Sequence, residues 1–391
     1  MSQTETTPKQ RRPARKAAPE LSSQEMLSEG DRLEGVEYDE DGDIIKGGFG
    51  QPPETEQASS LGSDLSARAP ASFGIREMFG LDLGWEEDTT GKPLKDAAGK
   101  KIPKEREVSG FAEPTKWTPA IDPAHVFPLE ETKALLLAFE LRDRILLVGE
   151  TGTGKTTLLE QVAARLNYNV VKINFDGGVT RSDLVGEWVI RGKEMEFQYG
   201  VLVHAFRMPG TIIILDEWDT ISGECAFVLQ RPLDKNDGKI LLMETKGELI
   251  PLHPDNIIAA TANTCGQGDE SGLYAHGTKV QNYSQLNRFG MTIRMEYLKP
   301  EKEMEMLRLR HPALKKEEAQ ALVKAITQVR EGYVRGELSV PLSPRDLINW
   351  ADKYLRMGDP IRAATYCFLN RMPPEDAQVT EQLIQRSFEG Q

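Results

Sequence analysis

The chain has 391 residues, with 61 acidic against 48 basic side chains, a formal net charge of −13 and three cysteines. This length predicts two domains, or one large domain with tails. The hydrophobic fraction of 39%, beside 34 Gly and 23 Pro, indicates a folded part diluted by a disordered part. The acidic balance argues against a general nucleic-acid binder, and the scattered Cys and His residues argue against a disulfide framework or a zinc site.

No targeting or membrane segment is expected. No apolar run approaches the ~20 residues of a membrane span. The opening MSQTETTPKQRRPARK lacks the apolar core of a secretory signal. We therefore expect a soluble, cytoplasmic protein.

Residues 1–116 are expected to form a largely disordered arm. A basic head is followed by an acidic run and by a polar low-complexity stretch at 51–72, which cannot bury enough apolar area to offset chain entropy. The apolar segment FGIREMFGLDLGW (73–85) interrupts this arm as a candidate docking segment. Two interpretations stay open: a peptide that docks on a partner or on the protein's own body, and a small local turn.

From residue 117 the pattern changes to helices alternating with short apolar strands. The expected strands are RILLVG (144–149), NVVKINF (169–175), TIIILD (211–216) and NIIAATAN (256–263), and the expected helices include PLEETKALLLAFELRD (128–143) and TTLLEQVAARLN (156–167). Continuous apolar strands between helices predict a parallel sheet covered on both faces, over residues 117–298. Four helical patterns after Pro300 predict a small all-helical lid domain at 299–391.

The strongest motif is GETGTGKT, residues 149–156, which matches GxxxxGK[ST] between a buried strand and a helix. Glycines let the backbone wrap a polyphosphate, and the helix N-terminus adds positive potential. Lys155 reaches the β- and γ-phosphate oxygens, and the Thr156 hydroxyl ligates Mg²⁺. The fold class predicted is therefore an α/β P-loop NTPase that uses ATP and Mg²⁺. Its nucleotide-binding residues would be Gly149, Glu150, Thr151, Gly152, Thr153, Gly154, Lys155, Thr156 and Thr157.

Three further polar residues lie at the carboxyl ends of expected buried strands. Asp216 ends TIIILD, so we assign it to Mg²⁺, and the adjacent Glu217 is the candidate catalytic base. Asn263 ends NIIAATAN, where its amide would hold the attacking water; a plain strand-ending Asn is the alternative. Asn174 ends another strand and would hold Glu217 inactive by a hydrogen bond, an interpretation that stays open.

Two arginines are candidates for stabilising charge on the γ-phosphate. Arg288 lies in SQLNRFGMTI, and Arg345 lies at the first turn of a helix in LSPRDLINW. A guanidinium suits this task because it is planar and permanently charged, although pairing with a surface carboxylate is the usual fate of an arginine. One domain cannot easily bring both to its own phosphates. We therefore expect a ring in which Arg288 serves the neighbouring subunit and Arg345 acts from the same chain, a step that rests partly on family analogy.

The order of these motifs resembles the AAA+ ATPases. Walker A, Walker B, sensor 1, arginine finger and sensor 2 would be residues 149–156, Asp216 with Glu217, Asn263, Arg288 and Arg345. Hairpin patterns at 183–206 and 238–256 are similar to those of the MoxR clade. The run ATANTCGQGDESGLYAHGT is similar to ATPase subunits of aerobic cobaltochelatases, while the acidic arm and Asn287 depart from their pattern.

The resemblance implies a hexameric ring motor that hydrolyses ATP to remodel a partner. The partners implied are a von Willebrand-type adaptor and a large chelatase subunit that inserts Co²⁺ into a corrin ring. This chain would then bind neither cobalt nor corrin. The alternative is a MoxR-type chaperone acting with another von Willebrand-domain partner, and the acidic charge disfavours a nucleic-acid motor. Tyr274 and His276, in SGLYAHGT, either face the ring pore or lie in a surface loop.

Overall fold

The computed structural model describes residues 36–38, 44–47, 67–96, 98–264 and 283–389. The basic head, most of the low-complexity arm and the loop with Tyr274 and His276 lie outside this described part of the chain. The chain divides into two units, Met1–Gln57 and Ala58–Gln391. The first contains an antiparallel hairpin of β1 (Val36–Tyr38) and β2 (Ile44–Gly47).

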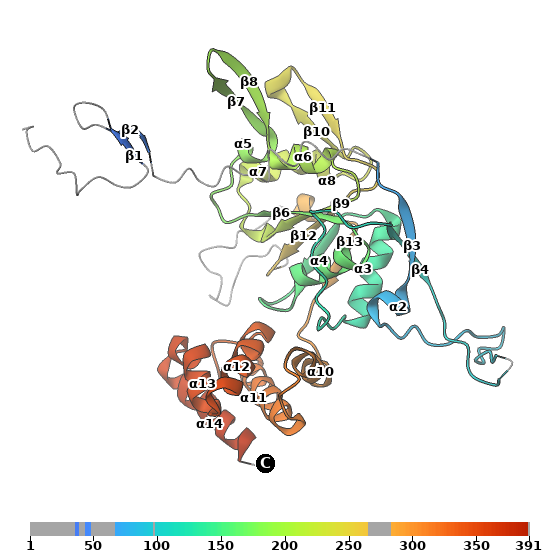
Figure 1. Cartoon of the computed structure of the whole chain (residues 1–391), viewed down its shortest axis with the longest axis vertical. Helices are drawn as coiled ribbons and strands as arrows, with labels where there is room; N and C mark the ends of the chain where they lie inside the picture. The colour runs from blue at the N-terminus through green and yellow to red at the C-terminus, as the bar shows by residue number, and fades with distance from the viewer. Residues whose placement is uncertain (1–35, 39–43, 48–66, 97, 265–282, 390–391) are drawn as a thin grey trace, which may run out of the picture. The chain divides into compact units, whose positions relative to one another are not determined.

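A five-stranded parallel sheet forms the centre of the second unit (Figure 1). Its strands lie in the order β13 (Met291–Arg294), β5 (Ile145–Val148), β12 (Ile257–Ala262), β9 (Thr211–Asp216) and β6 (Asn169–Asn174). Every neighbouring pair is parallel. The predicted parallel sheet is confirmed, and it brings the carboxyl ends of β5, β9 and β12 to one edge.

Helices cover both faces of the sheet, because side chains alternate along each strand. In β9, Ile212 and Ile214 belong to one hydrophobic cluster, and Ile213 and Leu215 belong to the other. The first cluster includes α3 (Leu129–Leu141) and α4 (Lys155–Arg165). The second includes α5 (Arg181–Val185), α6 (Val201–Arg207), α7 (Gly223–Val228) and α8 (Gln230–Leu233).

Two β-hairpins extend from the α/β body, where the sequence predicted them. The first is β7 (Gly186–Arg191) with β8 (Glu194–Tyr199), and it separates α5 from α6. The second is β10 (Lys239–Leu242) with β11 (Glu248–Pro251), directly before β12. They touch: the Trp188 indole donates to the Glu244 carbonyl oxygen at 3.2 Å.

In the carboxyl-terminal region, among the residues described from 300 to 389, every regular element is a helix. Its α-helices are α10 (Pro300–Arg310), α11 (Lys316–Val334), α12 (Pro344–Met357), α13 (Pro360–Cys367) and α14 (Pro374–Phe388), and a short 3-10 helix, Leu369–Arg371, precedes α14. A separate hydrophobic cluster holds these helices together around the fully buried Trp350. The predicted helical character of this region is confirmed, and α14 is a helix that was not predicted individually.

The expected arm differs from the structure after residue 66. β3 (Pro70–Gly74) pairs with β4 (Glu107–Phe111), and α2 (Ile75–Phe79) follows β3 directly. Ile75 and Phe79 are buried in the same cluster as α3 and α4. The candidate docking segment therefore packs on the body of its own chain.

One arginine fastens this amino-terminal hairpin. The Arg68 guanidinium donates to the Glu113 and Asn167 carbonyl oxygens, both at 2.6 Å. It also lies over the Phe111 ring, 4.3 Å from its centroid. The described part of the body thus includes residues well before 117, among them 70–79 and 107–111. Their apolar residues are too sparse to give a local signal, and their partners lie far along the chain.

Candidate active site

The phosphate-binding loop joins β5 to α4 as predicted. Two of its positions require glycine, each for a different reason. A Cβ on Gly149 would lie 2.1 Å from the carbonyl oxygen of Met295, so the chain directly after β13 approaches too closely for any side chain. Gly154, the N-cap of α4, has a φ of +87°, in the left-handed region that favours glycine. The helix N-terminus therefore presents its backbone amides without a capping side chain.

Lys155 is the central cation of the site. Its Nζ donates to the Gly149 carbonyl oxygen at 2.7 Å, the Glu150 carbonyl oxygen at 2.9 Å and Asn263 Oδ1 at 3.0 Å. The side chain is only 8% exposed. Burial lowers the pKa of Lys155 to about 8, although Asp219, Asp216 and other carboxylates oppose that shift. Lys155 is thus held ready beside the loop that would receive phosphate.

Asp216 and Thr156 meet across the loop. Thr156 Oγ1 donates to Asp216 Oδ1 at 2.8 Å, and the Thr261 hydroxyl donates to the same oxygen. Mg²⁺ prefers such hard oxygen ligands, bound through one or two protein groups plus substrate phosphates. Thr156 and Asp216 therefore fit a Mg²⁺ site. Thr261 was overlooked, and its only signal was a polar residue inside the apolar strand NIIAATAN.

Glu217 occupies an unusual backbone position. Its φ is +56°, in the left-handed region, which few non-glycine residues adopt and which clusters at functional sites. Its N–H donates to Thr261 Oγ1 at 3.2 Å. Burial, followed by the charges of Asp216 and Asp219, raises the pKa of Glu217. A raised pKa makes this carboxylate a better proton acceptor.

Asn174 lies beside Asp216 in the β6–β9 ladder, one position from Glu217. Among the hydrogen bonds of the described residues, none joins the Asn174 side chain to Glu217. The hydrogen bond expected to restrain Glu217 is therefore not formed in this structure.

Asn263 is oriented by an acid that the sequence analysis did not assign. Asp219 is fully buried. Its Oδ2 accepts the backbone N–H groups of Asn263 at 2.9 Å and Thr264 at 3.0 Å. This fixes the chain as it leaves β12, so that the Asn263 amide meets Lys155. The third acid of DEWD was its sequence signal.

These groups line a cavity of about 170 Å³. Its lining residues are Thr151, Gly152, Gly154, Lys155, Thr156, Thr157, Asp216, Glu217, Thr261, Ala262, Asn263 and Arg345. Arg345 reaches it from the first turn of α12, so the structure brings it to the phosphate loop. Arg288 does not line it, and its guanidinium donates instead to the carbonyl oxygens of Gln230 at 3.0 Å and Ser284 at 2.7 Å.

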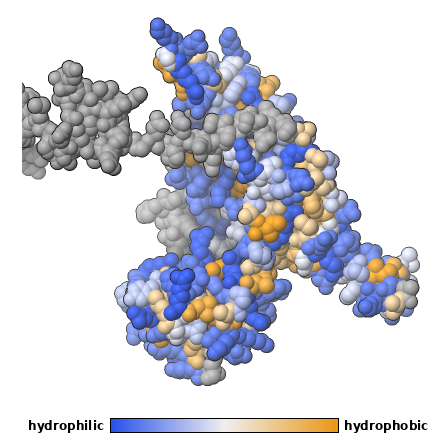
Figure 2. All heavy atoms as spheres, viewed as in Figure 1, coloured by the Kyte–Doolittle hydropathy of each residue, from blue (hydrophilic) through white to orange (hydrophobic). Residues whose placement is uncertain are grey.

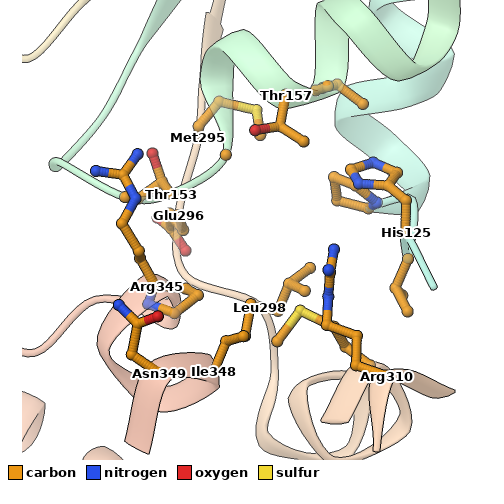
Figure 3. Close-up of a pocket in the computed structure, with 17 residues that line it drawn as sticks. His125, Thr153, Thr157, Met295, Glu296, Leu298, Arg310, Arg345, Ile348 and Asn349 are labelled. Carbon is orange, nitrogen blue, oxygen red and sulfur yellow. The ribbon is translucent and has the colours of Figure 1, made fainter. Parts of the chain in front are cut away.

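A second cavity of about 210 Å³ adjoins the first and shares Gly152, Gly154, Thr157 and Arg345 with it. Thr153 also lines it, whereas Gly149 and Glu150 line neither cavity. Figure 3 shows His125 on one side and Arg345, Ile348 and Asn349 of α12 on the other. Its mixed apolar and polar lining suits the base and ribose of a nucleotide.

His125 is the aromatic wall of this second cavity. Its ring lies edge-on to Phe127, with centroids 4.5 Å apart. Burial lowers the pKa of His125 to about 4, so the imidazole is neutral near pH 7. His125 was not among the predicted site residues, because a lone histidine carries no motif.

Within the described ranges, no helix combines the length and apolar character that crossing a membrane requires. The same residues contain no group of three or more His, Cys, Asp or Glu side chains placed to hold a metal ion.

Comparison with known proteins places this site in a family. Residues 144–275 match the AAA domain of the dynein-related subfamily. The aerobic cobaltochelatase subunit CobS of Sinorhizobium sp is 31% identical over 338 residues, which cover 84% of this chain and 94% of that protein. Protein NorQ of Paracoccus denitrificans is 26% identical over 68% of this chain and 93% of its own length. The von Willebrand factor A domain-containing protein 8 of Mus musculus is 24% identical over 58% of this chain and 12% of its own length. The chain therefore belongs to the AAA+ ATPases, within the MoxR clade and the family of the cobaltochelatase subunit CobS.

Proposed function

We propose that this ATPase is the CobS-like motor subunit that drives cobalt insertion into a corrin ring during cobalamin biosynthesis. The observation that carries the proposal is the 31% identity with CobS over 94% of that protein's length. The motor would remodel a partner complex, made of a von Willebrand-type adaptor and a large chelatase subunit that holds Co²⁺ and corrin. It would act as a hexameric ring in the cytoplasm.

The phosphate cavity supports a direct hydrolytic mechanism. Glu217 takes a proton from water, whose oxygen forms a bond to the γ-phosphorus while the bond to the β–γ bridging oxygen breaks. The products are ADP and inorganic phosphate. Asn263 orients the water, and Lys155 exchanges its carbonyl contacts for β- and γ-phosphate oxygens. Thr156 and Asp216 would hold Mg²⁺, which neutralises phosphate charge.

The two arginines have separate parts in this proposal. Arg345 lines the phosphate cavity of its own chain and would contact the γ-phosphate there. Arg288 lies away from that cavity and would serve the neighbouring subunit of the ring. A guanidinium supplied in trans can raise a phosphoryl-transfer rate by 10³–10⁵.

The two hairpins are the proposed contact with the partner. On one face of β7–β8, the exposed residues include Trp188, Ile190 and Met195, at 49%, 75% and 65% exposure. Hydrophobic side chains lie among hydrophilic ones at the hairpins in Figure 2. Arg181 donates to Glu244 Oε1 at 3.0 and 2.8 Å, which couples the second hairpin to α5, next to the first. Movement at one hairpin would therefore be transmitted to the other.

A MoxR-type chaperone or maturation ATPase with a different von Willebrand-domain partner is the second candidate. It is favoured by the similarity to NorQ and to the von Willebrand factor A domain-containing protein 8. Both candidates use the same ATP site, so only the partner separates them.

The variant E217Q tests the site and the partner together. It should retain bound ATP while hydrolysis falls by roughly 10²–10⁴-fold, because the base is lost and the phosphate cradle is kept. E224Q is the matched control, since Glu224 is an exposed acid at the start of α7. Turnover of E217Q at the wild-type rate would remove Glu217 from its role.

ATP-locked E217Q, captured from the native host, should retain its partner for identification by mass spectrometry. A large chelatase subunit, together with ATP-dependent Co²⁺ insertion in the reconstituted mixture, supports the cobaltochelatase proposal. Recovery of another von Willebrand-domain protein, without Co²⁺ insertion, would favour the second candidate.

A further inference from the structure

A charged pair is buried inside the helical region. Arg330 of α11 is 9% exposed, and Glu303 of α10 is fully buried. Arg330 NH1 donates to both carboxylate oxygens of Glu303 at 2.9 Å. Burial raises the pKa of Glu303, and the neighbouring guanidinium opposes that shift. Apolar residues can often replace such a buried ion pair without loss of stability. Stabilising the helical region is therefore not a sufficient reason for the pair, and a second role is expected.

The pair reaches the start of α12. Arg330 Nε donates to the Leu342 carbonyl oxygen at 2.7 Å. The next residue, Ser343, is the N-cap of α12, and both its backbone N–H and its hydroxyl donate to Asp346 Oδ2 at 2.8 Å. Arg345 lies in the first turn after this cap. The buried guanidinium thus fixes the point from which Arg345 projects.

The pair also reaches the phosphate loop. The Arg330 guanidinium lies over the Tyr297 ring, 4.2 Å from its centroid. The Tyr297 hydroxyl donates to the Thr151 carbonyl oxygen at 3.3 Å. Ser343 touches the same loop from α12, since a Cβ on Gly152 would lie 2.4 Å from Ser343 Cβ. Loop and helix are therefore linked both by direct contact and through Tyr297 and Arg330.

We infer that Arg330, held by Glu303, is a positioning residue that sets the hydrolysis rate by placing Arg345 against the phosphate loop. Neither Arg330 nor Glu303 lines the phosphate cavity, so their effect passes through α12 and Tyr297. The inference rests on the role proposed for Arg345. It places a rate-setting element in the helical region, at residues that no nucleotide-binding motif includes.

The test compares kcat and KM for ATP in four variants of the full chain. Y297F keeps the ring under Arg330 and removes the hydroxyl, E303Q keeps the shape of the carboxylate, and R330M removes the guanidinium. We expect R330M to lower kcat at least tenfold, with Y297F and E303Q between it and wild type, while KM changes less than about threefold. R335M is the control, because Arg335, the C-cap of the same helix, forms an exposed ion pair with Glu337, and its loss should leave kcat unchanged.

A double-mutant cycle decides whether the effect passes through Arg345. R345A should lower kcat, and adding R330M or Y297F to it should change kcat by less than about twofold. If the losses of kcat in the single variants instead multiply in the double variants, the positioning role of Arg330 is overturned, while the role proposed for Arg345 stands. An unchanged kcat in R345A would instead overturn the role proposed for Arg345, and the inference with it. Should R330M fail to fold by circular dichroism, Y297F and E303Q carry the test, and an unchanged kcat in both would overturn it.

Discussion

Lys155 is a charged side chain that is costly to bury while no phosphate is bound. Its ammonium rests on two carbonyl oxygens and the Asn263 amide, none of which carries a full charge. Burial consequently lowers its pKa to about 8. The pKa of Lys155 is lower in the folded protein than in the unfolded chain, where it is about 10.4. The contribution of Lys155 to the stability of the fold is therefore fully present above about pH 10.4 and is lost as the pH falls through about 8. A bound triphosphate supplies negative charge beside the ammonium and so favours its protonated form.

ATP affinity should therefore fall as pH rises. Binding requires the protonated lysine, so a pKa near 8 predicts a roughly tenfold loss of affinity between about pH 7 and about pH 9. Isothermal titration calorimetry of E217Q with ATP over this range measures it without turnover. K155R is the control, since its guanidinium stays charged, and its weaker affinity should be flat with pH. A flat profile in the Lys155 protein would contradict the prediction.

The sequence predicted the residues whose roles are local in the chain. Gly149 to Thr156 form one continuous motif, and Asp216 with Glu217 directly follow an apolar strand. Thr261 and Asp219 escaped prediction because their contacts depend on the register of neighbouring strands. Ala260 pairs with Leu215, which places Thr261 beside Asp216. No pattern within one segment contains that information.

At the scale of elements, α2 supports the wall of the second cavity. Phe79 is buried and lies edge-on to Phe127, with centroids 5.0 Å apart. Phe127 in turn contacts His125, and the Arg165 guanidinium of α4 lies 4.6 Å from the centre of its ring. The segment singled out in the arm therefore braces the chain that faces the expected nucleotide base.

F79A should lower the free energy of unfolding by about 3–5 kcal/mol, as large-to-small substitutions of buried aromatic residues do. It should also weaken ATP binding more than tripolyphosphate binding, because only the base cavity loses support. Urea unfolding and calorimetry with the two ligands measure these effects. L94A, at an exposed leucine of the same amino-terminal region, is the control and should change stability by less than about 0.5 kcal/mol. Equal stability of F79A and wild type would show that α2 is not part of the core.

Whether an element could be predicted depends on how far along the sequence its partners lie. The sheet strands and their helices were predictable, since each is a continuous apolar run or an amphipathic repeat. β3 and β4 were not, because α2 and a long turn-rich stretch separate two short strands that pair only with each other. The two hairpins at 186–199 and 239–251 were predicted chiefly through family resemblance. The helix α14 was overlooked, although its amphipathic pattern is present in the sequence.

For the whole molecule, the fold class was predictable from the alternation of apolar strands and helices along the sequence. Whether a single chain supplies every residue of the active site was not. One chain brings Lys155, Asp216, Glu217, Asn263 and Arg345 to a single cavity. It leaves Arg288 anchored to carbonyl oxygens of α8 and α9 (Tyr283–Leu286), outside that cavity. If Arg288 completes a site on the next subunit, then each active site contains residues of two chains.

Mixing two variants that are each impaired in ATP hydrolysis tests this assembly. R288A should lower ATP turnover more than it lowers ATP affinity, and E217Q should be inactive as described above. In a mixed ring, an R288A subunit keeps its own Glu217 and receives Arg288 from an E217Q neighbour, which restores one complete site. Random head-to-tail assembly of equal amounts would restore about a quarter of the wild-type turnover. The double variant R288A/E217Q mixed with R288A should restore none. If the first mixture stays inactive while light scattering shows that the variants assemble together, then Arg288 does not act across a subunit interface.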